Sequence, residues 1–211
     1  MGLPPIDTLL KHLDATYPRA SCALTYQTPL QLLIATILSA QCTDERVNKV
    51  TPSLFKKYRK VEDFAQADLD QLQEEIRSTG FFKNKAKTIK ACCQKIVKDF
   101  GGEVPESLEE MVKLPGVGRK TANLVLGEIH HIPGIIVDTH VRRLSKRLGL
   151  TDSDNPYKVE QDLMKVIPKD RWTLFSHQLI HHGRQICKAK KPACYKCPLS
   201  DICHYYMQNR S

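Results

Sequence analysis

Four cysteines crowd one short segment near the C-terminus and restrict what this chain can fold around. Cys187, Cys194, Cys197 and Cys203 give the spacing C-x6-C-x2-C-x5-C. Four thiolates at such intervals can wrap a single metal centre, and the polar residues between them argue against four free core cysteines. Zinc sites with four thiolates usually combine two close cysteine pairs, whereas only one close pair exists here. The spacing therefore favours an iron–sulfur cluster over zinc.

The charge of the chain is compatible with a polyanionic partner. Its formal net charge is +9. A surplus of this size is typical of proteins that bind a polyanion, with nucleic acid as the first candidate, and equally of a basic surface that only aids solubility. Part of the surplus lies in the loop KAKKPA between the first two clustered cysteines. Lys190 and Lys191 in this loop are therefore either phosphate contacts or solvated lysines.

No segment indicates a membrane or a secretory route. No apolar run approaches the roughly 20 residues that span a bilayer, and the N-terminus lacks the pattern of a signal peptide. We expect a soluble, intracellular monomer, cytoplasmic and nucleoid-associated if the source is bacterial. The remaining cysteines are then expected to be small core residues; they are Cys22, Cys42, Cys92 and Cys93.

Apolar periodicity predicts an all-α chain without strands. Residues 30–38 are apolar nearly all round, as in a central buried helix. Asp44 is expected to cap the next helix, and a change of pattern at residues 132–134 suggests a boundary between two lobes. The helix signals delimit residues 6–13, 30–38, 44–55, 68–80, 84–100, 107–114, 119–129, 138–149, 156–167 and 172–186.

The segment LPGVGRKT predicts a tight glycine turn between two helices, within residues 107–129. Gly116 and Gly118 remove side chains where the backbone turns and where another chain approaches. We expect the amides from Gly116 to Lys120, those of Val117 and Arg119 included, to point outward and bind one phosphate. Such a contact positions DNA without reading its sequence. The alternative is a purely structural turn.

Two residues are candidates for chemistry. Lys120 follows Arg119 in the first turn of a predicted helix, and both the helix end and the neighbouring cation favour the neutral amine that a nucleophile needs. A phosphate contact or a plain surface lysine is the alternative. Asp138, in IIVDTHVRR, is expected to cap the following helix. Its carboxylate can also stabilise a developing cation on a sugar ring or shuttle protons.

Taken in order, these motifs resemble one known family. LPGVGRKTAN, then VDTHVRR, then the four cysteines are similar to the endonuclease III family, the iron–sulfur branch of the helix-hairpin-helix DNA glycosylases. The resemblance runs from about residue 28 to residue 203. Any one of the motifs is common, whereas the ordered set is specific to this family.

The resemblance implies a helix-hairpin-helix glycosylase fold made of two helical lobes with a DNA cleft between them. A six-helix barrel is expected over residues 22–132, with the hairpin at about 107–129. Residues 1–21 and 133–211 are expected to form the other lobe. This second lobe carries a C-terminal loop around a [4Fe–4S] cluster.

The implied activity is that of a bifunctional DNA glycosylase and AP lyase of base excision repair. Lys120 matches the lysine that attacks C1′ of a damaged nucleotide and forms a Schiff base, after which β-elimination cuts the strand 3′ to the lesion. Asp138 matches the family's essential aspartate. The implied substrates are oxidised or ring-saturated pyrimidines and abasic sites in double-stranded DNA.

The resemblance also assigns residues to the distorted duplex, because chemistry on a base requires it to leave the stack. Gln41 matches a glutamine that fills the gap left in the base stack by the displaced nucleotide. Phe81 falls where part of the family uses a leucine wedge, and an aromatic ring can also intercalate; of the pair Phe81-Phe82, we expect one ring to be exposed and one to be packed. His140 and either Arg142 or Arg143 lie near Asp138 in the sequence and are expected to contact phosphate or to hold Asp138.

Two other functions compete with this one. A mismatch glycosylase of the same superfamily usually lacks the lysine at the position of Lys120. The adenine-specific type also carries a catalytic glutamate on the early buried helix, yet residues 30–40 contain no acid. A non-catalytic helix-hairpin-helix DNA-binding module explains the charge and the cysteines, but it does not require Lys120 together with Asp138.

Overall fold

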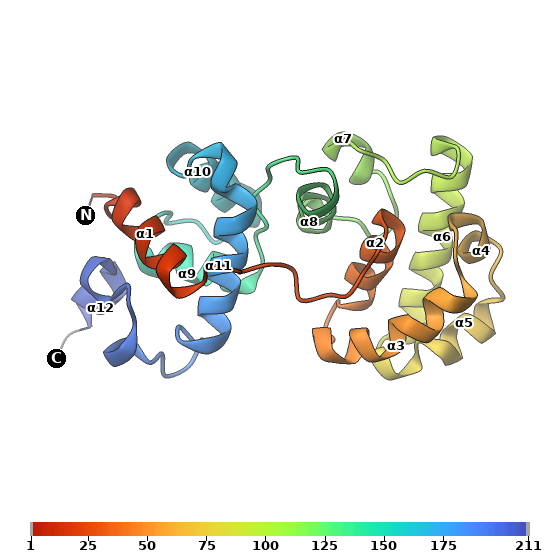
Figure 1. Ribbon diagram of the computed structural model, residues 1–211, viewed down its shortest axis with the longest axis horizontal. Coiled ribbons are helices and arrows are strands. Elements are labelled where there is room, and N and C mark those ends of the chain that lie inside the picture. Colours follow the sequence, from red (N-terminus) through yellow and green to blue (C-terminus); the bar gives the residue numbers. More distant parts are fainter. Residues whose placement is uncertain (1, 210–211) are drawn as a thin grey trace. The chain divides into compact units, whose positions relative to one another are not determined.

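The structure, a computed structural model, describes residues 2–209 (Figure 1). Every regular element in this range is helical and none is a strand, which confirms the predicted all-α class. The chain divides into two compact units. One spans Ala23–Ile132, and the other joins the segment up to Cys22 to the segment from Pro133 onward.

The Ala23–Ile132 unit is built from one continuous stretch of chain. Its elements are α2 (Pro29–Leu38), α3 (Asp44–Lys57), α4 (Val61–Ala65), α5 (Leu69–Glu75), the 3-10 helix η1 (Arg77–Thr79), α6 (Phe82–Phe100), α7 (Leu108–Met111) and α8 (Arg119–Ile129). In α2 every residue from Leu32 to Leu38 is buried, as expected of a central helix. The amphipathic α6 buries Ile89, Cys92 and Ile96 along one face and ends at Gly101 in the left-handed conformation.

Some details of this unit differ from the sequence-based prediction; the single helix expected over residues 68–80, for example, is divided into α5 and η1. Thr43, and not Asp44, is the cap of α3, because the Thr43 side chain accepts a hydrogen bond from the amide of Arg46. The short helix α4 was not predicted. Its five residues are too few to establish a periodic pattern, and it is held by Asp63, whose carboxylate accepts hydrogen bonds from the amides of Arg59 and Lys60.

The second unit assembles helices from both ends of the chain. Its elements are α1 (Ile6–Thr16), α9 (Thr139–Leu148), α10 (Pro156–Val166), η2 (Lys169–Arg171), α11 (Trp172–Gln185), η3 (Cys194–Lys196), η4 (Ser200–Ile202) and α12 (His204–Gln208). In Figure 1 the N-terminal α1, drawn in red, lies beside the blue α11. Leu9 and Leu13 of α1 share an apolar core with Leu144 of α9 and with Phe175 and Leu179 of α11.

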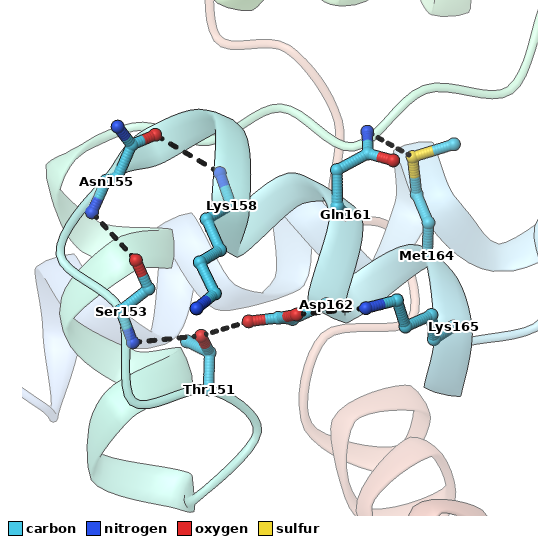
Figure 2. A network of polar contacts seen from close by, with 8 residues as sticks. All are labelled: Thr151, Ser153, Asn155, Lys158, Gln161, Asp162, Met164 and Lys165. Atoms are coloured by element: carbon cyan, nitrogen blue, oxygen red, sulfur yellow. Dashed lines mark hydrogen bonds and ion pairs between the residues drawn. The ribbon is translucent and has the colours of Figure 1, made fainter.

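A polar network fixes the loop that leads into α10 (Figure 2). Asn155 caps the helix by accepting hydrogen bonds from the amides of Tyr157 and Lys158. The amide of Asn155 donates to Ser153, and Thr151 donates to Asp162 at 2.7 Å. The loop and the helix that follows are therefore held together by side chains from both.

Across the described residues, no helix combines the length and the apolar character needed to cross a membrane.

Candidate functional site

The glycine turn lies between α7 and α8, as predicted. Ser107 caps α7 by accepting a hydrogen bond from the amide of Glu110, and its hydroxyl donates to the Glu110 carboxylate at 2.9 Å. Gly116 has a φ of +75°, and a Cβ built there would lie 2.2 Å from Cγ2 of Thr88 on α6. Glycine is therefore required at position 116 both for backbone conformation and for packing.

One amide of this turn is not available to a ligand. The N–H of Val117 donates to the carbonyl of Leu114 at 3.1 Å, and the Val117 side chain is buried. The expectation that every amide from Gly116 to Lys120 points outward is therefore wrong for Val117. Gly118 caps α8 in an extended conformation, and among residues 2–209, apart from its chain neighbours, no atom lies within 4 Å of a Cβ built on it. The start of α8 is thus open at Gly118, and Lys120 is exposed in its first turn.

Asp138 caps α9 as expected. Its Oδ1 accepts a hydrogen bond from the amide of Val141 at 2.8 Å, and the residue is half-buried. The carboxylate has a second oxygen and further lone pairs, so the capping bond leaves acceptor capacity for a substrate. Lys120 belongs to the Ala23–Ile132 unit and Asp138 to the other.

Arg143 connects α9 to the end of α11 within one unit. Its guanidinium donates to the carbonyl of Cys187 at 2.8 Å and to that of Gly183 at 3.1 Å, at the end of α11. The same Nη2 lies 3.1 Å from Nδ1 of His140. Burial lowers the pKa of His140, which favours a neutral ring near pH 7. A contact of either residue with phosphate stays a prediction.

Gln41 and Phe81 line one cleft of about 340 Å³ in the Ala23–Ile132 unit, together with Thr88 and Gly116. Both residues are exposed, and both have left-handed backbones, with φ values of 53° and 48°. Phe81 is 62% exposed, whereas Phe82 is half-buried with the Arg77 guanidinium over its ring. One exposed and one packed ring were expected. Left-handed backbones at non-glycine residues are costly and gather at functional sites.

Sequence reasoning missed a buried cation beside this cleft. Lys85 is only 5% exposed, and its Nζ donates to the carbonyls of Leu38 and Thr79, each at 2.7 Å. Burial lowers the pKa of Lys85, and the nearby Cys42 partly opposes this effect. The signal for it was present in the sequence, because Lys85 falls on the same face of α6 as Ile89, one turn further along.

The four C-terminal cysteines line a single cavity, whose walls are mainly apolar and include Leu144 and Leu199. Within residues 2–209, no group of three or more His, Cys, Asp or Glu side chains is placed to hold a single metal ion. Four thiols on the wall of one cavity are the positive observation. This arrangement fits a polynuclear cluster, which is larger than one ion and is held by thiolates.

Polar contacts to the sulfurs fit the same kind of group. Nη1 of Arg147 donates to Sγ of Cys187 at 3.2 Å, and Nε2 of His182 lies 3.3 Å from Sγ of Cys197. Hydrogen bonds of this kind tune clusters held by thiolates. Burial raises the pKa of the Cys197 thiol to about 11, so ligation by this residue has to displace a proton.

Arg147 holds the lysine loop, residues 188–193, by hydrogen bonds to its backbone. Arg147 donates to the carbonyls of Lys188 at 2.8 Å and Ala189 at 3.0 Å. Lys190 and Lys191 are exposed, and Lys191 has a left-handed backbone with a φ of 50°.

The four cysteines outside the C-terminal segment divide into two pairs. Cys92 and Cys93 are buried as predicted, whereas Cys22 and Cys42 are only half-buried, so the expectation of a core position is wrong for these two.

Comparisons with known proteins agree with one another. The model of the HhH-GPD superfamily of base excision DNA repair proteins matches residues 34–169. The chain is 56% identical to endonuclease III of Synechocystis sp. over 92% of this chain and 90% of that protein. It is 46% identical to endonuclease III of Bacillus subtilis over 96% and 93% of the two chains.

Solved structures of two kinds of protein are also similar to this chain. A structure of a trapped endonuclease III–DNA covalent intermediate, in an estranged-adenine complex, is similar with a TM-score of 0.92 at 46% identity, over 96% of each chain. A structure of a thermostable thymine-DNA glycosylase is similar with a TM-score of 0.85 at 25% identity, over 96% of this chain and 95% of that one.

Proposed function

This chain belongs to the endonuclease III family of HhH-GPD base excision DNA repair proteins, and from this we propose which of its residues carry out the reaction. The resemblance read from its motifs is confirmed. As a member of this family it is a bifunctional DNA glycosylase and AP lyase. Its proposed substrates are oxidised or ring-saturated pyrimidines and abasic sites in double-stranded DNA, which it would meet inside the cell.

Lys120 is the proposed nucleophile. Its neutral Nζ attacks C1′ of the damaged nucleotide, the glycosidic C–N bond breaks, and the base leaves with the bonding electrons and takes up a proton. The nitrogen lone pair then forms an imine as the sugar ring opens and O4′ is protonated. Loss of a proton from C2′ expels the phosphate at C3′. Water finally hydrolyses the imine, which releases an unsaturated aldehyde and restores Lys120.

Asp138 is the proposed charge stabiliser and proton carrier. A carboxylate stabilises the positive charge that develops on the sugar when the base departs. It also takes and returns protons during imine formation. The cap bond from Val141 to Oδ1 holds this side chain in one orientation and supports this assignment.

The proposed DNA contacts fall into two classes. The open end of α8 at Gly118, with Arg119, and the exposed Lys190 and Lys191 bind phosphates, so they position the duplex without reading it. Gln41 and Phe81 enter the base stack and fill the space left by the displaced nucleotide.

A [4Fe–4S] cluster is the proposed cofactor, held by Cys187, Cys194, Cys197 and Cys203. When bound, it supplies a polynuclear iron centre that links four points of the C-terminal segment. Arg147 contacts both a cysteine sulfur and the backbone of the lysine loop, so it couples the ligands to Lys190 and Lys191. We expect Cys194→Ser to lose iron and the visible thiolate–iron absorbance. Full iron content and an unchanged spectrum would show that Cys194 is not a ligand.

The observation that carries this proposal is the near full-length identity of 56% to an endonuclease III, in a chain that holds both LPGVGRKT and VDTH. The test uses a duplex with one ring-saturated pyrimidine. We expect base release and strand cleavage at equal rates, with an unsaturated aldehyde at the 3′ end. Base release without cleavage would contradict the lyase step and indicate a monofunctional glycosylase. Duplex binding with neither reaction would indicate a non-catalytic DNA-binding module.

A further inference from the structure

Lys85 is the one lysine or arginine among residues 2–209 whose side chain is buried. Taking an ammonium group out of water is costly unless it is hydrogen-bonded. No carboxylate in the described part of the chain pairs with it, and its two hydrogen bonds run to main-chain carbonyls. The placement of these carbonyls therefore indicates what the buried charge stabilises.

Each carbonyl lies at the end of a helix that leads into a left-handed residue. Leu38 is the last residue of α2, and Gln41 follows three residues later with a φ of 53°. Thr79 is the last residue of η1, and Phe81 follows two residues later with a φ of 48°. The last carbonyls of a helix lack donors within the helix and carry partial negative charge, so a cation suits them.

The main chain of Lys85 adds a third connection. Its amide donates to the carbonyl of Phe81 at 3.0 Å, in the first turn of α6. Lys85 thus contacts the chain on both sides of Gly80. Its side chain donates to the carbonyl of Thr79, and its amide donates to the carbonyl of Phe81. The same ammonium reaches across to Leu38, 47 positions away in sequence. Gln41 and Phe81 line the same cleft, which the hairpin residue Gly116 also lines.

We propose that Lys85 is a positioning residue that fixes Gln41 and Phe81 relative to each other, so that both side chains enter the duplex together when a nucleotide is displaced. This inference rests on the proposed function and deepens it. A lysine suits the task because it carries three donors on a flexible stem. An apolar residue at position 85 would leave two buried carbonyls unpaired.

Two activities of this protein should respond differently to the loss of Lys85. Base excision from a duplex needs Gln41 and Phe81 correctly placed relative to each other, because the DNA helix has to be opened and the gap in the base stack filled. Imine formation on an abasic site in single-stranded DNA needs neither step. Loss of the Lys85 ammonium should therefore impair the first reaction and spare the second.

The experiment compares Lys85→Met with Lys87→Met, which removes the same charge from an exposed position on α6. The single-turnover rate of base excision is measured on a duplex with a ring-saturated pyrimidine. Borohydride trapping is measured on a single-stranded abasic oligonucleotide. For Lys85→Met we expect an excision rate at least about tenfold lower, as small displacements of positioning groups can cause, with trapping within about twofold of wild type. Lys87→Met should stay within about twofold in both assays.

Coupling provides a second readout that a loss of stability alone would not produce. In a background with Gln41→Ala and Phe81→Ala, the change Lys85→Met should have no further effect on excision, because the groups that it positions are gone. A full additional loss in that background would overturn the proposal. Equal losses in excision and trapping, or no loss in either, would overturn it as well.

The outcomes also separate this inference from the proposed function. If wild-type protein neither excises the base nor forms the adduct, the proposed function fails. If wild type does both and Lys85→Met does both equally well, only the role of Lys85 fails. Should Lys85→Met not fold, Lys85→Arg is assayed in its place. It keeps the charge but enlarges the head group, and the same selective loss of duplex excision is expected.

Discussion

At the scale of single residues, several candidate side chains have a structural task beside the proposed chemical one. Asp138 caps α9, Arg143 ties α9 to the end of α11, and Arg147 contacts both a cysteine sulfur and the lysine loop. A loss of activity on mutation therefore says little unless the structural task is preserved. Substitutions that keep the hydrogen bond and remove only the charge separate the two roles.

Asp138→Asn makes this separation. Asparagine caps helices about as well as aspartate, so we expect the melting temperature to stay near that of wild type. The excision rate should fall at least about 100-fold, because an amide cannot carry a proton or balance a cationic sugar. Asp68→Asn is the matched control, since Asp68 caps α5 by accepting from the amide of Gln71 at 2.8 Å. A large drop in the melting temperature with Asp138→Asn, or an unchanged excision rate, would contradict the proposed role.

The helices and several buried residues could be predicted from the local pattern, whereas contacts with distant parts of the chain and the choice between neighbouring capping residues could not. The helix predicted over residues 119–129 is α8, and Cys92 and Cys93 are buried as expected. The helical pattern could have shown that Lys85 is buried, but not its hydrogen bond to Leu38, which lies on another helix. The preference of threonine over Asp44 as the cap of α3 was also missed, since adjacent residues with similar propensity compete for one position.

At the scale of elements, the two glycines of the hairpin have different reasons to be glycine. Gly116 adopts a left-handed conformation against α6, whereas Gly118 has a φ of −90° with open space beside it. Glycine at position 116 is therefore required for folding. At Gly118 the space beside the backbone is not filled by the protein, which fits the close approach of a phosphate at the start of α8.

Replacing each glycine by alanine tests this difference. Gly116→Ala should lower the free energy of unfolding by about 1–3 kcal/mol, because the new methyl group meets Thr88 and the backbone is strained. Gly118→Ala should leave stability within about 0.5 kcal/mol but weaken duplex binding several-fold. Urea denaturation and fluorescence anisotropy at fixed salt measure the two effects. Equal destabilisation by both substitutions would contradict the distinction.

At the scale of the whole chain, one unit is completed by segments from its two ends. The Ala23–Ile132 unit is an insertion between α1 and α9. Asp14 on α1 forms an ion pair with Arg171 and accepts a hydrogen bond from Gln178, 164 positions away. Burial alone raises the pKa of Asp14, but the hydrogen bonds from Gln178 and Arg171 outweigh it and leave that pKa below its usual value.

This ion pair gives the stability of the chain a pH dependence of known sign. A carboxylate with a lowered folded pKa contributes stability above its unfolded value of 3.8, and the contribution disappears as pH falls through the folded value. Asp14→Asn should therefore lower the free energy of unfolding at pH 7 by about 0.5–1 kcal/mol, a modest effect because the pair is partly exposed. The difference from wild type should shrink as pH falls from 4 to about 3. Denaturation curves for both proteins at each pH measure it, and a constant difference would rule out this linkage.

Lys120 is proposed to form a Schiff base with C1′ of the damaged nucleotide. Borohydride trapping on an abasic-site duplex, with wild type and Lys120→Gln side by side, tests it most directly. We predict a covalent adduct with wild type alone, and peptide mapping should place the reduced sugar on Lys120. An adduct with both proteins would assign the chemistry to another amine. No adduct with either, while both still bind the duplex, would contradict the lyase mechanism itself.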